Sequence, residues 1–323
     1  MLIGHQRIWD FLTQSAAKNR LAHAYLFVGP AQIGKKTLAA EFAKWLLCQQ
    51  KKNNSACGVC RSCLDIAKNQ HPDLFILSPK QEEKKGVVKT FEIGIGEIKT
   101  LRRHLSLFPY SAKYKIAVID EVGSLTREAI NSFLKTLEEP GQNTLIILIS
   151  SSWQFILPTI ISRCQLIKFL PVKEQKLAVG LKKIGKKEGD ILKIIKLAAG
   201  RPGQAINLLE NPEILAGQQA GIDSFKKTLK ADLAWRWDLA KELSQNLAVA
   251  QETLSQWSLW LRDRLLEASG CEHLLVGSRA ETKISYPVKN LLAIIKEVQR
   301  TQDILSNSSF NSRLALEVLM MKI

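Results

Sequence analysis

The chain has 323 residues, which allows two or three domains, and its apolar fraction of 46% is ordinary for a globular protein. The sequence contains no run of about 18 apolar residues and no signal-peptide pattern at its start, so we expect a cytoplasmic protein without a membrane partner. The formal net charge of +16 favours association with a polyanion, and nucleic acid is the leading candidate.

Residues 29–37 read Gly-Pro-Ala-Gln-Ile-Gly-Lys-Lys-Thr and form an incomplete phosphate-binding loop. Gly29, Gly34 and Lys35 complete the Gly-x4-Gly-Lys part of the pattern. The next position normally carries the Ser or Thr hydroxyl that ligates Mg²⁺, and here it is Lys36. The loop therefore predicts a nucleotide-type fold that does not ligate Mg²⁺, and it leaves open whether ATP still binds.

The segments around this loop support the same interpretation. An apolar run over residues 24–28 predicts a strand, and residues 37–47 have apolar positions at helical spacing. Strand, glycine loop and helix in this order point helix N–H groups at a phosphate. Thr37 is a candidate nucleotide-site residue, but it is turned by roughly 100° from the position of the missing hydroxyl. The alternative is an ordinary strand–turn–helix with a basic start.

Four of the six cysteines follow one another closely, with the spacing C-x8-C-x2-C-x2-C: Cys48, Cys57, Cys60 and Cys63. In a reducing compartment, close Cys-x2-Cys pairs suit a tetrahedral Zn²⁺ held by four thiolates. Four protein ligands leave no open coordination position, so we expect structural zinc rather than a catalytic metal. A redox pair and a coincidence of spacing are the alternatives.

A second set of motifs follows in the middle of the chain. The apolar run at residues 114–119 ends in Asp120 and Glu121, and in an ATPase such acids support the metal and activate the attacking water. Residues 129–140 read as an amphipathic helix stopped by proline, and residues 145–152 as a buried strand that ends in hydroxyls. The pattern predicts that Asp120 and Glu121 belong to the same site as the glycine loop.

These motifs together resemble the clamp-loader branch of the AAA+ ATPases, in particular the subunits of the bacterial DNA polymerase III clamp loader. The resemblance is strongest between residues 4 and 164 and weakest between residues 211 and 306. It rests on the following segments: Ile3-Gly4-His5-Gln6, residues 21–27, the cysteine module after the loop helix, Asp120-Glu121, the Asn-x-x-Leu-Lys-x-Leu-Glu-Glu-Pro helix, Ser162-Arg163-Cys164 and residues 313–317.

The resemblance implies a fold with three parts. Residues 1–165 would form an α/β AAA+ P-loop domain with a parallel sheet, into which a zinc module at residues 48–63 is inserted. Residues 166–210 would form a helical lid, and residues 211–323 an all-α collar that holds subunits together in an oligomer.

The spacing of apolar residues independently predicts a helical bundle in the last third of the chain. Apolar residues recur there at helical intervals, as expected for the core face of a helix, for example Leu254, Trp257, Leu261 and Leu265. Trp235 and Trp237 are expected to pack in that core rather than to stack on bases.

Within the family, the altered loop resembles the delta prime branch rather than gamma/tau. The resemblance then implies a stator that is folded as an ATPase but is not an active ATPase by itself. Arg163 would act in trans, as an arginine finger on ATP held by a neighbouring subunit, and Arg201 resembles the sensor arginine of the family. The implied partners are the gamma/tau and delta subunits, the sliding clamp, and primed DNA through the assembly.

Two other functions remain open at this stage. Gly34, Lys35, Asp120 and Glu121 fit an active gamma-type ATPase, and the four cysteines fit a zinc-dependent nucleic-acid-binding module outside any loader. The alternative for Arg163 is a surface salt bridge.

Overall fold

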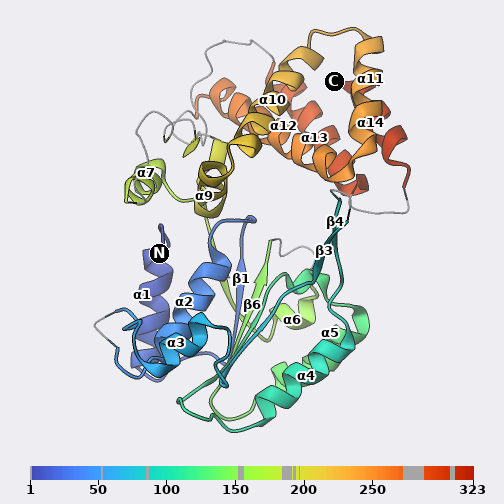
Figure 1. The fold of residues 1–323 in the computed structure, drawn as a ribbon. Helices are drawn as coiled ribbons and strands as arrows, with labels where there is room; N and C mark the ends of the chain where they lie inside the picture. The colour runs from blue at the N-terminus through green and yellow to red at the C-terminus, as the bar shows by residue number, and fades with distance from the viewer. Residues whose placement is uncertain are drawn as a thin grey trace. The chain divides into compact units, whose positions relative to one another are not determined.

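The computed structural model describes most of the chain, namely residues 2–51, 54–84, 87–151, 156–183, 191, 194–195, 197–271, 287–305 and 310–323. Two compact units are present (Figure 1). Unit 1 comprises Met1–Lys84, Lys89–Lys176 and Arg201–Gly203, and unit 2 comprises Lys85–Val88, Leu177–Gly200 and Gln204–Ile323. The division into an α/β domain, a lid and a collar at residues 165 and 210 stays a prediction.

The centre of unit 1 is a five-stranded sheet in the order β2-β5-β6-β1-β7, and all of its recorded strand pairs are parallel. This confirms the expected α/β fold with a parallel sheet. The strands are β1 (Ala24–Val28), β2 (Leu74–Leu77), β5 (Lys115–Ile119), β6 (Thr144–Ser150) and β7 (Gln165–Lys168). The carboxyl ends of parallel strands meet at one edge, so the segments after β1, β2, β5 and β6 converge there.

Helices cover both faces of this sheet (Figure 1). On one face lie α1 (Gln6–Ala17) and α2 (Lys35–Leu47), and on the other lie α4 (Ile95–Ser106), α5 (Arg127–Glu138) and α6 (Pro158–Ile161). The smaller elements of unit 1 are α3 (Arg61–Ala67) and the 3₁₀ turn η1 (Val122–Ser124). A separate two-stranded sheet pairs β3 (Gln81–Lys84) with β4 (Val87–Thr90).

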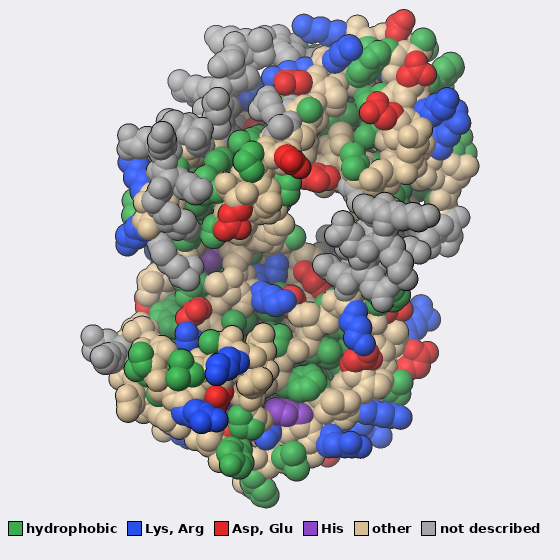
Figure 2. All heavy atoms as spheres, viewed as in Figure 1, with side chains coloured by type: hydrophobic (Ala, Val, Ile, Leu, Met, Phe, Trp, Pro, Cys, Tyr) green, Lys and Arg blue, Asp and Glu red, His purple; other side chains and the backbone are tan. Residues whose placement is uncertain are grey.

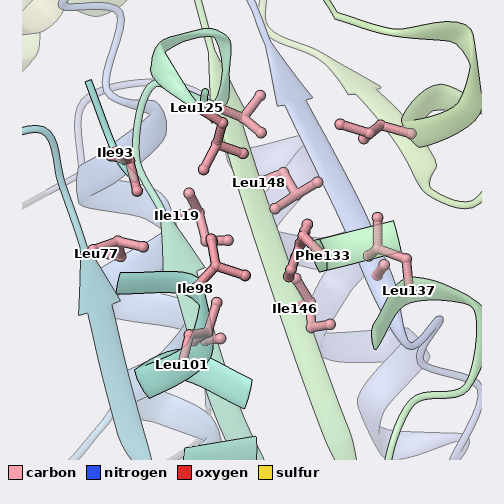
Figure 3. Packing of buried hydrophobic residues seen from close by; sticks show 14 of the residues in the cluster. Leu77, Ile93, Ile98, Leu101, Ile119, Leu125, Phe133, Leu137, Ile146 and Leu148 are labelled. Carbon is pink, nitrogen blue, oxygen red and sulfur yellow. The ribbon is translucent and has the colours of Figure 1, made fainter. Parts of the chain in front are cut away.

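The alternation of side chains along the strands explains the two cores. In β1, Tyr25 and Phe27 face α1 and α2, while Leu26 faces α4 and α5. Strands buried on both faces are apolar throughout rather than alternating, and this is why they were recognisable as continuous runs. Figure 3 shows the core between the sheet and helices α4 and α5, to which β6 contributes Leu148 and α5 contributes Phe133.

Unit 2 is helical in its described part. Its helices include α10 (Pro212–Thr228), α11 (Leu233–Gln245), α12 (Leu247–Ala268), α13 (Val288–Leu305) and α14 (Ser312–Lys322). Two helices, α7 (Glu174–Lys182) and α9 (Pro202–Glu210), contain residues of both units. Leu254, Trp257 and Leu261 are fully buried, as their spacing predicted. None of the helices in the described ranges has both the length and the apolar content needed to cross a membrane.

The prediction that Trp235 and Trp237 pack in the core was wrong for Trp237, which is 48% exposed. Trp235 is half-buried, and the ammonium of Lys227 lies 4.8 Å from its ring centroid. The buried residues of α11 are Ala240 and Leu243, so the core-facing stripe of this helix is narrow and leaves Trp237 at its border.

Candidate functional site

The glycine loop joins β1 to α2, as the sequence predicted. Gly34 has φ 103°, a backbone conformation that favours glycine, and a Cβ at Gly29 would lie only 2.4 Å from the carbonyl oxygen of Phe169. Lys35 is 4% exposed, and its ammonium donates hydrogen bonds to the carbonyl oxygens of Gly29 (2.6 Å) and Pro30 (2.8 Å). Burial lowers the pKa of Lys35. The loop lysine is thus held by its own loop.

Lys36, which replaces the expected hydroxyl residue, reaches across the carboxyl edge of the sheet. Its ammonium lies 3.0 Å from Oδ2 of Asp120 and 3.1 Å from Oγ of Ser78. Phosphate-loop ATPases hold Mg²⁺ between the loop hydroxyl and an acid at the end of another strand of the same sheet. In this chain a tethered cation, Lys36, lies against the acid that would support the metal.

Glu121, the second acid, has a different set of partners. It has φ 49°, and its Oε2 accepts hydrogen bonds from the backbone N–H (3.4 Å) and the hydroxyl (3.2 Å) of Ser151. The structure therefore brings Lys35, Lys36, Asp120 and Glu121 to one edge of the sheet. The opposing field of the two carboxylates partly offsets the lowering of the pKa of Lys35 by burial.

Three further segments support the loop. His5 Nε2 lies 2.9 Å from the carbonyl oxygen of Ile33, and burial lowers the pKa of His5, which favours a neutral ring. The Gly203 N–H donates a hydrogen bond of 2.8 Å to the carbonyl oxygen of Gln32, so the segment of Arg201, just before α9, lies against the loop. Thr37 is exposed on the first turn of α2.

The site contains residues that sequence reasoning missed. Ser78 and Ser151 each come directly after a strand of the sheet, β2 and β6. Locating the ends of the expected strands could have found them, because all such ends meet at one edge.

The four clustered cysteines come together beside α2 and α3, as their spacing predicted. Their sulfur atoms all lie within 4.8 Å of one another, and the distance is 3.9 Å between Cys48 and Cys60 and 4.0 Å between Cys57 and Cys63. Zinc–sulfur bonds of about 2.3 Å in a tetrahedron place the sulfurs about 3.8 Å apart. The donor set and its dimensions therefore fit one tetrahedral metal ion such as zinc.

Backbone groups support thiolate character in this cluster. The N–H of Cys57 donates to Sγ of Cys48, and the N–H of Cys60 donates to Sγ of Cys57, both at 3.3 Å. Burial acts to raise the pKa of Cys60, but hydrogen bonds from the backbone outweigh it and lower the pKa to about 6. Cys63 differs, because burial raises its pKa to about 12 and favours the neutral thiol in the absence of a metal ion. Four sulfurs without other ligand types leave no open coordination position, so the cluster is suited to a structural ion.

Arg163 lies just after α6, far along the chain from the glycine loop. Its guanidinium forms an ion pair of 2.5 Å with Glu138 at the end of α5, and it also donates to the carbonyl oxygen of Thr159 at 2.9 Å. Both charged side chains are partly exposed, 33% for Arg163 and 47% for Glu138. The arginine is therefore held in a surface ion pair, and a modest cost would release it to another anion.

The fold and this edge of the sheet define the chain as a phosphate-loop type α/β protein with a cysteine cluster suited to a metal ion. A family described as "DNA polymerase III, delta subunit" matches residues 4–173. This match covers more than half of the chain. The chain therefore belongs to this family of DNA polymerase III clamp-loader proteins.

Individual relatives agree with this assignment. The chain is 36% identical over 159 residues to the DNA polymerase III subunit delta' of Pseudomonas aeruginosa, covering 49% of this chain and 45% of the relative. It is 29% identical over 263 residues to the subunit tau of Bacillus subtilis, covering 79% and 45%. In both cases the match spans about half the length of the relative. The delta' subunit of Escherichia coli is 26% identical over 280 residues, covering 86% and 78%.

A solved structure supports the fold. The gamma subunit-related protein of Thermotoga maritima superposes with a TM-score of 0.51 at 16% identity, covering 96% of this chain and 97% of that one. This likeness concerns the fold alone.

Proposed function

We propose that the chain acts as the delta prime-type stator of a DNA polymerase III clamp loader. It would support ATP-driven loading of the sliding clamp onto primed DNA without hydrolysing ATP itself. The observation that carries the proposal is the 3.0 Å contact between Lys36 and Asp120, because an ammonium group lies at the carboxylate that would otherwise support Mg²⁺. We expect such a site to hydrolyse ATP poorly, although it retains Lys35, Asp120 and Glu121, because it lacks the loop hydroxyl that holds Mg²⁺.

In this function Arg163 acts on a neighbouring subunit. A guanidinium that reaches the γ-phosphate of ATP bound by the adjacent subunit stabilises the negative charge of the transition state. In other nucleotide hydrolases such arginine fingers raise the rate of hydrolysis by factors of ~10³–10⁵. The partial exposure of Arg163 and its pairing with Glu138 support this role, since an ion pair near the surface contributes only ~0–1 kcal/mol and can exchange for another anion. Arg201 would take the sensor position.

The remaining parts have structural roles in this proposal. Zn²⁺, held by Cys48, Cys57, Cys60 and Cys63, would fix the segment between α2 and α3. The bundle of α10 to α14 would serve as the collar that binds the gamma/tau and delta subunits, and α7 with α9 would belong to the lid. All of these partners are implied by the family and would place the protein in the cytoplasm.

The test is ATP hydrolysis by a reconstituted loader that carries Arg163→Ala. We expect Arg163→Ala to abolish the ATP hydrolysis that depends on the adjacent subunit's site and to leave assembly of the loader unchanged. Arg163→Lys should restore little of this hydrolysis, because lysine lacks the planar guanidinium with its paired donors. Arg61→Ala serves as the matched control, since Arg61 is an exposed arginine of unit 1 paired with Asp65. Undiminished hydrolysis with Arg163→Ala would refute the trans role.

A further inference from the structure

Arg163 is held against the carboxyl end of α5 by several contacts. Its Nη2 forms the ion pair with Glu138, and its Nη1 donates hydrogen bonds to the carbonyl oxygen of Thr159 (2.9 Å) and to Oγ of Ser162 (3.3 Å). Its Nε–H is buried and has no hydrogen-bond partner among the residues that the structure describes. All of these residues belong to unit 1, in which α6 packs against α5 (Figure 1).

These contacts leave few donors of Arg163 for another ligand. A guanidinium has five N–H donors, shared between Nη1, Nη2 and Nε. Thr159 and Ser162 accept from Nη1, Glu138 accepts from Nη2, and the Nε–H group is enclosed by protein. Only part of Nη2 therefore remains for a phosphate, whereas arginine binds phosphate best through two parallel donors. To present such a pair, the guanidinium has to leave Glu138.

The position of Glu138 is unfavourable for the helix that carries it. Glu138 is the last residue of α5, and Glu139 follows it as the C-cap. The carboxyl end of a helix bears partial negative charge, so carboxylates there are disfavoured, and Lys135 is the basic residue of that last turn. Glu138 gains a contact with Arg163 in compensation, whereas Glu139 is exposed and takes no part in this ion pair. The two glutamates therefore share charge and helix-end position and differ in this contact.

The surrounding surface does not favour either sign of charge. Acidic and basic side chains both lie on the part of unit 1 that carries α4 and α5 (Figure 2). Exposed charges are also screened by salt beyond about 10 Å at 0.1 M ionic strength. The effect of Glu138 on Arg163 therefore comes from their direct contact.

We propose that Glu138 is a latch for Arg163, which holds the guanidinium at the end of α5 until the γ-phosphate on a neighbouring subunit competes for it. The proposal rests on the proposed trans role of Arg163 and adds the carboxylate that restrains it. The latched and the engaged state differ in the anion that the arginine binds, so removing the carboxylate shifts the population toward the engaged state. Glu138 acts through Arg163 and is a positioning residue.

The test measures ATP hydrolysis by loaders reconstituted from purified gamma/tau, delta and variants of this chain, without clamp or DNA. Glu138→Gln removes the charge at nearly constant size. We expect it to raise kcat by about two- to fivefold, the factor to which an ion pair near the surface corresponds. KM for ATP should stay unchanged, because the arginine acts in the transition state. Co-elution with gamma/tau and delta shows that each variant assembles.

Two further variants separate the contact from charge and helix effects. Glu138→Asp keeps the carboxylate and is expected to retain most of the restraint. Glu139→Gln is the matched control, because it removes the same charge from the same helix end, and its kcat should equal that of the wild type. A kcat of Glu138→Gln at or below the wild-type value would overturn the latch, and so would an equal rise in Glu139→Gln.

Combination with Arg163→Ala separates the latch from the trans role on which it rests. The rise caused by Glu138→Gln should vanish in the Arg163→Ala background, because the latch acts on that side chain, and a rise that persists there would reject it. Undiminished hydrolysis with Arg163→Ala alone refutes the trans role and the latch together. If Arg163→Ala abolishes the hydrolysis at the adjacent site and Glu138→Gln does not raise it, only the latch fails.

Discussion

Lys36 occupies the position at which a phosphate loop normally presents a hydroxyl, and its ammonium lies 3.0 Å from Asp120. The side chain of Lys36 is 56% exposed, so the ion pair itself contributes only ~0–1 kcal/mol to stability. The pair matters more for whether Asp120 can bind Mg²⁺. A carboxylate that already faces a cation attracts Mg²⁺ less strongly, and the loop offers no hydroxyl in exchange.

Replacing this lysine tests the effect of one residue. Lys36→Thr removes the ammonium and supplies the missing hydroxyl, so we predict tighter, Mg²⁺-dependent binding of ATP than in the wild type, by about tenfold or more. The measurement is titration of the purified chain with a fluorescent ATP analogue, with and without Mg²⁺. Lys36→Met is the control that removes the charge without adding a ligand. If Lys36→Thr and wild type bind Mg-ATP equally, Lys36 is not what blocks the metal.

At the scale of single elements, the cysteine module shows how closely spacing can predict a site. Cys57, Cys60 and Cys63 fall on a turn and the start of α3, so their separation in sequence nearly fixes their separation in space. Cys48 follows the last residue of α2, which brings the fourth sulfur to the same point. Sequence therefore sufficed to predict that the four sulfurs come together, because these cysteines are close in the chain, and zinc in the cluster stays a prediction.

Removing one sulfur ligand is predicted to abolish tight metal binding. Cys60→Ser should reduce the zinc content of the purified chain from about one ion to near zero and lower its melting temperature, because structural zinc contributes directly to folding free energy. Metal content is measured by plasma mass spectrometry. Cys164→Ser is the control, since Cys164 packs against the core on the far side of the sheet from α2. Unchanged metal content in Cys60→Ser would exclude the four-cysteine site.

The buried carboxylate of Asp73 yields a prediction about pH. It lies 3.4 Å from the buried ammonium of Lys115 and accepts hydrogen bonds from N–H groups of the loop between α4 and β5. Burial acts to raise the pKa of Asp73, but hydrogen bonds from Tyr110 and Ser111 outweigh it, and the pKa is lowered overall. A carboxyl whose folded-state pKa is depressed stabilises the protein above its unfolded pKa of about 3.9, and this contribution is lost as the pH falls through the folded-state value.

Asp73→Asn is therefore expected to lower the free energy of unfolding by about 3–5 kcal/mol at pH 7, the usual cost of leaving a buried charge unpaired. The difference from the wild type should begin to shrink below about pH 4, because the Asp73 carboxyl then takes up a proton in the unfolded chain while it stays ionised in the folded protein. Urea unfolding at several pH values measures both effects. Asp65→Asn breaks only the exposed pair with Arg61 and should cost ~0–1 kcal/mol. A difference that does not change between pH 7 and pH 3 would contradict the assignment.

At the scale of the whole molecule, the sequence predicted the parallel sheet, the helical C-terminal part and the convergence of Lys35 with Asp120 and Glu121. These follow from apolar runs and from the rule that strand ends meet at one edge. It could not predict that Arg163 pairs with Glu138, or that Gly203 lies against Gln32. Such contacts join residues distant in the chain, and their geometry depends on how helices and loops pack rather than on local pattern.

We infer that the chain is built like an ATPase but does not hydrolyse ATP alone. The decisive experiment measures ATP hydrolysis by the purified wild-type chain, with Mg²⁺ and zinc supplied and no other subunit present. We expect a rate indistinguishable from that of Lys35→Ala and Asp120→Asn. Wild-type turnover clearly above both variants would contradict it and would favour the gamma-type motor.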